Sequence, residues 1–461
     1  MFRSLSEDKR SFYRRVLLIA VPILIQNGIT NFVSLLDNIM VGQVGTLQMS
    51  GVSIANQLLL IFNLCIFGGC SGAGLFTAQF HGSQDFDSVR HTFRFKLLLC
   101  TGLSLLGCGV FAFGGESLIG LYLRGEGDAR EAALSLGYGM DYMRIMLIGL
   151  LPFALSNMYS STLRESGQTV VPMIAGVAAV LTNLVLNYVL IFGHLGFPAL
   201  GVRGAAIATV LSRFAELAIM AVWTARNADR HPFIRGAFRS IHIPKPLLLS
   251  ILRKGLPLLV NEFLWSSGMA MLSQSYSTCG LDVVPAMNIS TTLQNLCSVV
   301  SLAMANAVGI IMGQMLGAGC EEKEVRAANR RIIVLAVASA ALFGGITAGV
   351  STLFPQLYNT TPQVRQLATA LICIVAAMMP FQAYTVCCYF TMRSGGQVLL
   401  TFLFDSCFIW VVNVPLAFAL SRFTGLSILP LFALCQSPEI IRCILGGSML
   451  HKGVWIRNLT K

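Results

Sequence analysis

Long runs of apolar residues recur along this chain, and they constrain its fold more than any other feature. Each run is about as long as the roughly 20 apolar residues that a helix needs to cross a bilayer. None alternates with a period of two, which argues against a β-barrel. The predicted fold is an all-α polytopic membrane protein with twelve transmembrane helices, at residues 16–41, 52–79, 96–114, 133–162, 169–193, 202–224, 255–278, 284–314, 331–350, 366–391, 397–420 and 428–450.

The composition excludes the soluble classes of protein. Of the 461 residues, 55% are apolar and only 11% are charged, whereas an ordinary soluble protein is about 25% charged. A soluble enzyme, a disordered chain and a repeat solenoid are therefore rejected. The 13 cysteines lie mostly inside apolar runs without metal-binding spacing, so they are predicted to be packing residues.

The lysines and arginines set the expected orientation. Only five fall in the loops predicted to lie outside, namely Arg124, Arg130, Arg203, Arg365 and Arg422. Most of the others lie in segments that share a side with the N-terminus, and such an excess marks the cytoplasmic side. We therefore expect a multi-pass protein of the cell membrane (plasma or inner) with both termini in the cytoplasm. The same bias accounts for the net charge of +12 without a nucleic-acid partner.

The two halves of the chain repeat each other. Pro22 and Pro257 are 235 residues apart, and so are Gln79 and Gln314, and Gly82 and Gly317. Six spans in each half predict two pseudo-symmetric six-helix lobes around a central cavity, which is the plan of an alternating-access transporter. The expected organisation is an N-terminal lobe over 1–225, a cytoplasmic linker over 226–254 and a C-terminal lobe over 255–461.

Acidic residues within the spans are functional candidates, because an unpaired carboxylate is costly in hydrocarbon. Three have an arginine within one turn of their own helix, and the predicted pairs are Asp141–Arg144, Glu216–Arg213 and Glu439–Arg442. Asp37, Glu262 and Asp405 have none and need another partner, a proton or a bound cation.

The candidates fall into two groups by depth. Asp37, Asn183, Asn187 and Thr209 all reach the outer half of the first six spans, and this oxygen-rich set suits a hard cation or a proton. Glu262 and Asp405 lie at similar depth in the inner half of the second six spans. Trp265 and Trp410 follow one turn later and offer faces on which a flat cation can stack. Helix-packing roles remain the alternative for both groups.

Together these residues give the chain its resemblance to a known family. The segments that carry it are Ala20-Val21-Pro22, Asp37–Gly42, Gln79-Phe80-His81-Gly82, Leu256-Pro257 through Asn261-Glu262, Gln314–Gly317, Arg393–Gly396, Asp405 with Trp410 and Pro415, and the tail Trp455–Thr460. Over essentially the whole chain, the sequence resembles the multidrug and toxic compound extrusion (MATE) family of secondary transporters, of bacterial type.

The resemblance implies export of organic, often cationic and amphipathic compounds in exchange for Na⁺ or H⁺. It implies a coupling site at Asp37, Asn183, Asn187, Ala205 and Thr209, with Asp37, Asn183, Asn187 and Thr209 as Na⁺ ligands if sodium is the ion, and a hinge at Pro22. Asn187 stands where some relatives carry an acid. Asn261, Glu262, Asp405, Trp265 and Trp410 are the candidate coupling or substrate residues of the second lobe. We expect no cofactor besides the coupling ion. The expected partners are the lipid bilayer and small organic substrates, and the protein is expected to be a monomer.

Three other functions were weighed. A lipid or lipid-linked oligosaccharide flippase of related architecture is the main alternative, although Arg144, Arg213 and Arg442 each have a local acid rather than lining a phosphate groove. A membrane enzyme is disfavoured because the six histidines fall in or beside loops and form no HExxH motif. The two-lobe pseudo-symmetry argues against a channel.

Overall fold

In the computed structural model, residues 9–123, 129–280, 282–358 and 360–460 are described, and they are almost entirely helical. Eleven helical stretches of the described residues are long and apolar enough to cross a membrane. The twelfth is α7, whose apolar run is interrupted by charged residues such as Arg253 and Glu262. The twelve-helix prediction is therefore confirmed, with the spans extending beyond the predicted ends wherever a helix continues past its apolar part.

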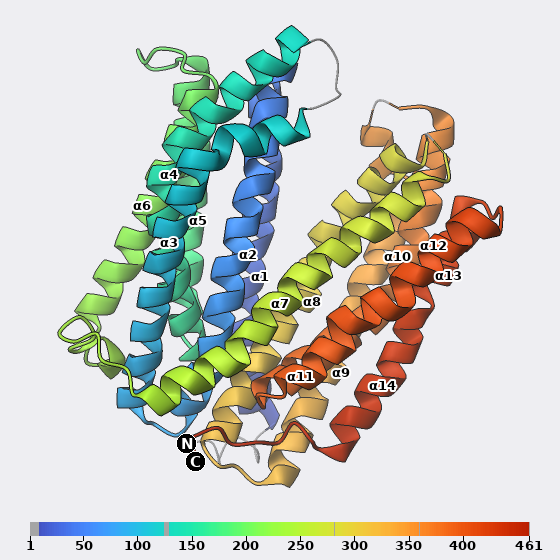
Figure 1. Ribbon diagram of the computed structural model, residues 1–461. Coiled ribbons are helices and arrows are strands. Elements are labelled where there is room, and N and C mark those ends of the chain that lie inside the picture. Colours follow the sequence, from blue (N-terminus) through green and yellow to red (C-terminus); the bar gives the residue numbers. More distant parts are fainter. Residues whose placement is uncertain (1–8, 124–128, 281, 359, 461) are drawn as a thin grey trace. The chain divides into compact units, whose positions relative to one another are not determined.

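The helices follow one another along the chain, mostly with short connections, and a longer one over 227–244 joins α6 to α7 (Figure 1). They are α1 (Lys9–Gly42), α2 (Thr46–Gly82), α3 (Phe86–Tyr122), α4 (Ala129–Glu165), α5 (Val170–Phe192), α6 (Val202–Arg226), α7 (Lys245–Ser277), α8 (Val283–Gly317), α9 (Glu322–Gly349), α10 (Pro362–Ser394), α11 (Val398–Phe402), α12 (Val414–Phe423), α13 (Ile428–Gln436) and α14 (Pro438–Lys452), with short turns η1 (Pro232–Ile234) and η2 (Phe354–Leu357). The eleventh span runs from α11 to α12 through two π-helical segments, η3 (Leu403–Cys407) and η4 (Ile409–Asn413). The twelfth span comprises α13 and α14, which meet at Ser437-Pro438.

The chain forms two compact units. The N-terminal unit comprises Ile25–Thr77 and Asp85–Gly255, and the C-terminal unit comprises the described parts of Met1–Leu24, Ala78–Gln84 and Leu256–Lys461. Helix α1 passes from one unit to the other between Leu24 and Ile25, two residues after Pro22, which lies inside the helix. Proline removes one helical hydrogen bond, and the hinge expected at Pro22 stays a prediction.

The repeat predicted from residue spacing has a direct counterpart within the C-terminal unit. A side chain added at Gly82 would collide with the carbonyl oxygen of Gln314, and one added at Gly317 would collide with the carbonyl oxygen of Gln79. Gln314 is the repeat equivalent of Gln79, and Gly317 is that of Gly82, so the two contacts are equivalent under the repeat. This reciprocal contact is what a pseudo-two-fold relation between α2 and α8 produces, and it requires glycine because the backbones touch.

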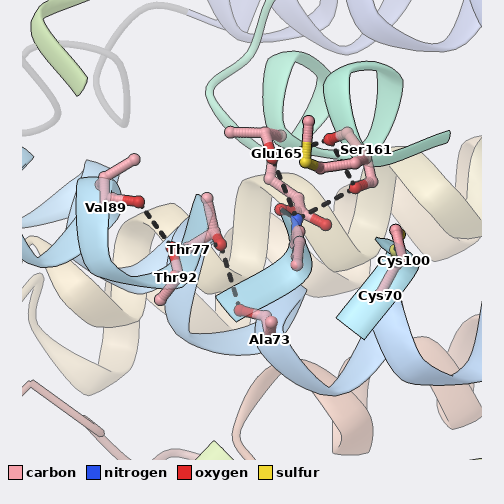
Figure 2. Close-up of polar contacts among 11 residues, drawn as sticks. Cys70, Ala73, Thr77, Val89, Thr92, Cys100, Ser161 and Glu165 are labelled. Atoms are coloured by element: carbon pink, nitrogen blue, oxygen red, sulfur yellow. Dashed lines mark hydrogen bonds and ion pairs between the residues drawn. The ribbon is translucent and has the colours of Figure 1, made fainter. Parts of the chain in front are cut away.

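A buried ion pair joins α3 to α4 in the N-terminal unit. The Nζ atom of Lys96, whose side chain is fully buried, lies 2.5 Å from Oε2 of Glu165 and donates to the hydroxyl of Ser161 at 3.0 Å. Figure 2 shows Glu165 and Ser161 converging on this nitrogen, with the Cys70 and Cys100 thiols nearby, 3.6 Å apart. Such a pair persists in a low-dielectric interior only because its charges are both paired and hydrogen-bonded.

Candidate functional site

The polar residues predicted on the first, fifth and sixth spans come together in the N-terminal unit. Asn187 of α5 donates from Nδ2 to Oδ1 of Asp37 on α1 at 2.7 Å. Asn183, one turn earlier on α5, lies 3.1 Å from Asn187 Nδ2 and 3.2 Å from the hydroxyl of Thr209 on α6. The Thr209 hydroxyl in turn donates to the carbonyl oxygen of Ala205 at 3.0 Å. All five residues that the sequence nominated therefore share one site.

The two carboxamides can serve Asp37 in either of two ways. With the Asn183 amide turned over, its nitrogen lies 3.0 and 2.9 Å from the two carboxylate oxygens of Asp37. A carboxamide presents an NH₂ group to a bare carboxylate and its oxygen to a cation. The buried Oδ1 of Asn187 has no hydrogen-bond partner among the described residues. This oxygen is therefore an acceptor without a donor, directly beside an acid.

Asp37 has no lysine or arginine as an ion-pair partner within the part of the chain that the structure describes. It lines two cavities of the N-terminal unit, of about 320 and about 360 Å³. Phe153, Thr209 and Arg213 also border both cavities. Arg213 is paired with Glu216 at 3.3 Å and lies over the Phe153 ring, as the local spacing predicted for the ion pair.

Several polar residues of these cavities were not nominated from the sequence. Arg164 donates to Oε1 of Gln26 at 2.6 Å, and both line the smaller cavity with Ser156, whose buried hydroxyl has no partner among the described residues. Tyr142 lines the larger cavity and donates to Oδ1 of Asn56 at 3.2 Å. The sequence offered a signal for Arg164, because Arg393 follows it by 229 residues, close to the spacing of the repeat. Tyr142 had none, because a tyrosine within a span is common.

The second group of candidates is also brought together, but with counter-ions. Asn261 of α7 donates to Oδ2 of Asp405 at 3.1 Å. The other oxygen of Asp405 accepts from Arg442 of α14 at 2.9 Å, and Arg442 also pairs with Glu439 at 3.1 Å. Glu262 lies 4.0 Å from the guanidinium of Arg393. Asp405 therefore has a basic partner, Arg442, which lies 37 residues away in the sequence, and its carboxylate is not left for a proton or a bound cation alone.

Asp405 belongs to the π-helical segment η3, and its surroundings are mostly packing contacts. Arg442 lies over the rings of Phe404 and Phe408, at 5.1 and 5.7 Å from their centroids. Trp410 donates from Nε1 to the carbonyl oxygen of Leu264 at 2.9 Å. Trp265 and Trp410 are both exposed. A π-helical segment within an α-helix often accompanies a functional site. Here the ion pairs described above account for the charges of Asp405 and Arg442.

One predicted ion pair is wrong. Asp141 of α4 does not rely on Arg144, which is exposed, but accepts from Nη2 of Arg203 on α6 at 2.9 Å. Arg203 at the start of α6 takes the place predicted for Arg144, because α4 and α6 pack side by side. The pair between Glu439 and Arg442 is confirmed.

Comparisons with known proteins agree with this fold. The MatE family model matches residues 22–189 and 257–419. The chain is 24% identical over 457 residues to the probable multidrug resistance protein NorM of Thermotoga maritima, covering 97% of this chain and 94% of that protein. It is 25% identical to the probable multidrug resistance protein YoeA of Bacillus subtilis, covering 92% and 90%. The crystal structure of a mutant of the Vibrio cholerae MATE transporter VcmN shares the fold, with a TM-score of 0.85, 17% identity and 99% of each chain covered.

Proposed function

Because the chain belongs to the MatE family and is a MATE transporter with many membrane-spanning helices, we propose that it is a secondary active antiporter. It exports small organic compounds, often cationic and amphipathic, in exchange for Na⁺ or H⁺ by alternating access. The relatives named as multidrug resistance proteins support this substrate class. The proposal places the protein in the plasma or inner membrane as a monomer with both termini in the cytoplasm.

One observation carries the proposal: two carboxamides and a hydroxyl surround Asp37, and among the described residues no lysine or arginine forms an ion pair with it. Arg213 borders the same cavities and attracts Asp37 at longer range, but its ion pair is with Glu216. Carboxylate, amide and hydroxyl oxygens are the ligands that a hard cation prefers. The partnerless Oδ1 of Asn187 adds an acceptor beside the carboxylate. Na⁺ would be held by Asp37, Asn183, Asn187 and Thr209, and a proton would reside on Asp37 itself.

The membrane potential supplies the driving force for entry of the cation. Each elementary charge that crosses is worth about 2.3 kcal/mol per 100 mV. A cation bound at Asp37 neutralises the charge of the carboxylate. Binding changes the relative stability of two arrangements of the helices only if the ion has a different affinity for each arrangement. In the proposal, Pro22 allows α1 to bend as Asp37 changes charge, and the bend lowers the affinity for the organic substrate.

The flippase alternative finds no support in these contacts. A phosphate groove needs arginines that are available to the ligand. Arg213 and Arg442 are each paired with an acid, at 3.3 and 2.9 Å, and Arg164, which also lines the smaller cavity, donates to Gln26 at 2.6 Å. The relatives named above are multidrug resistance proteins.

The test is Asp37→Asn in purified protein reconstituted in vesicles. We expect loss of substrate transport driven by an ion gradient, with binding of the organic substrate retained, because the amide cannot exchange a charge. The control is Asp141→Asn, which removes an acid of the same unit that is paired with Arg203 and lines neither cavity. If the Asp37→Asn protein transports the substrate with unchanged ion dependence, Asp37 is not the coupling residue.

A further inference from the structure

The segment between α6 and α7, residues 227–244, packs against α3. Arg94 of α3 donates to three backbone carbonyls of this segment, those of Gly236 at 2.8 Å, Ala237 at 3.0 Å and His242 at 3.2 Å. Phe233 is buried against the ring of Phe93, with 5.6 Å between centroids. Figure 1 shows the segment returning beside the lower end of α3 before α7 begins. The backbone of this segment is therefore anchored to α3.

The exposed side chains in this part of the chain are strongly basic. Seven lysines and arginines lie in the stretch from Arg226 to Lys254, against a single acid, Asp229, which is already paired with Arg235. Several of the basic residues beyond the end of α6 are exposed and have no ion-pair partner among the described residues. They are Arg230, Arg239, Lys245 and Arg253.

Large apolar side chains are exposed between these charges. Phe238 is 61% exposed and Ile241 is 68% exposed. In the first turns of α7, Leu249 is 65% exposed and Leu252 is 46% exposed. At 100° per residue these two leucines share a face with Lys245, while the fully buried Ile251 faces the opposite side. Basic and apolar side chains on one face are the pattern of a segment that lies in a membrane interface.

We propose that this surface, the linker patch (Arg230, Phe238, Arg239, Ile241, Lys245, Leu249, Leu252 and Arg253), binds anionic phospholipid headgroups of the cytoplasmic leaflet. The four cations contact the phosphates, and the four apolar side chains enter the boundary between headgroups and acyl chains. Charge complementarity selects this occupant, because a neutral lipid offers the apolar contact but no net charge. The inference rests on the predicted cytoplasmic side of the linker and is independent of the coupling ion.

The experiment uses quenching of tryptophan fluorescence by lipids with brominated acyl chains in vesicles that contain the full-length protein. Trp265, Trp410 and Trp455 are replaced by phenylalanine in this protein and in all its variants, so that Trp223 is the one tryptophan. Trp223 of α6 reports on the linker patch, because its ring centre lies 5.3 Å from that of His231. We expect brominated phosphatidylglycerol to be preferred over brominated phosphatidylcholine by about tenfold at low salt, since each basic residue near the surface contributes to attraction. The preference should disappear at high salt, where the Debye length is short.

Two variants separate the basic and apolar parts. Replacing Arg230, Arg239, Lys245 and Arg253 by glutamine should bring the two lipids to equal quenching. Replacing Phe238 and Ile241 by serine should weaken quenching by both lipids and leave their ratio unchanged. If serine at these two positions changes nothing, the apolar contact is refuted.

The matched control removes four exposed basic residues from the C-terminal unit on the same predicted side. It combines Lys323→Gln, Arg330→Gln, Lys452→Gln and Arg457→Gln. We expect it to retain the preference for phosphatidylglycerol at Trp223. A single-tryptophan protein with an intact linker patch but without that preference, or a control that loses it as fully as the linker variant does, overturns the proposal.

Discussion

Asn187→Asp is the substitution that probes the proposed coupling site most quantitatively. The Asn187 amide nitrogen lies 2.7 Å from Oδ1 of Asp37, so the variant places a second carboxylate against the first. Two unit charges about 4 Å apart interact by about 4 kcal/mol at an effective dielectric constant of 20. Since about 1.4 kcal/mol corresponds to a factor of ten, the variant should hold a coupling cation up to about a thousandfold more tightly.

The assay is substrate transport in vesicles as a function of coupling-ion concentration. We expect half-maximal transport of Asn187→Asp at an ion concentration at least about tenfold below that of the wild type, with slower turnover because the ion is released late. Asn157→Asp is the control, since Asn157 lines the smaller cavity but donates to the carbonyl of Phe153 rather than to Asp37. An unchanged ion dependence in Asn187→Asp, or an equal shift in the control, would refute the reasoning.

Two further predictions concern parts of the N-terminal unit away from Asp37. Lys96→Met removes the buried ammonium that pairs with Glu165 and should cost about 3–5 kcal/mol, lowering the thermal unfolding midpoint in detergent. The double variant with Glu165→Gln should recover most of the loss, and a double variant as unstable as Lys96→Met would contradict this. Burial, with a smaller contribution from Arg230, lowers the pKa of His231 below its ordinary value, so this imidazole is neutral at pH 7 and gains its proton only under more acidic conditions. Fluorescence of Trp223 should therefore change with a midpoint on the acid side of that ordinary value, and His231→Gln should abolish the change; a midpoint at or above the ordinary value would refute the shift.

The fold could be predicted from the sequence because its dominant signals are local or periodic. Apolar runs mark the spans regardless of how they pack. The spacing of 235 residues between Gly82 and Gly317 also has a structural cause: each glycine is required where α2 and α8 touch. The ends of the helices were less accessible, because α3 continues through polar residues such as Arg90 and Arg94 before its apolar part begins.

The site of the N-terminal unit was predictable for a related reason. Asn183 and Asn187 are one turn apart and must share a face, and the depths of Asp37 and Thr209 match theirs. The contacts that the sequence missed join residues far apart along the chain. Asp405 meets Arg442 through η3 and α14, and nothing in the local sequence distinguishes that partner from any other arginine.

The same limit explains the wrong partner for Asp141. A local pattern ranks Arg144 first because it is three residues away. Packing of α4 against α6 brings Arg203 within 2.9 Å instead. Pairing between helices depends on their mutual rotation, which periodicity alone does not fix.

The most direct test of the central claim is transport of a fluorescent organic cation by the purified protein in vesicles, with Na⁺ and H⁺ gradients imposed separately. An antiporter coupled at Asp37 should move the dye outward against its gradient when one inward ion gradient is present, and Asp37→Asn should abolish that movement. Dye movement that only dissipates the dye's own gradient, equally with either ion gradient or with none, would contradict the account.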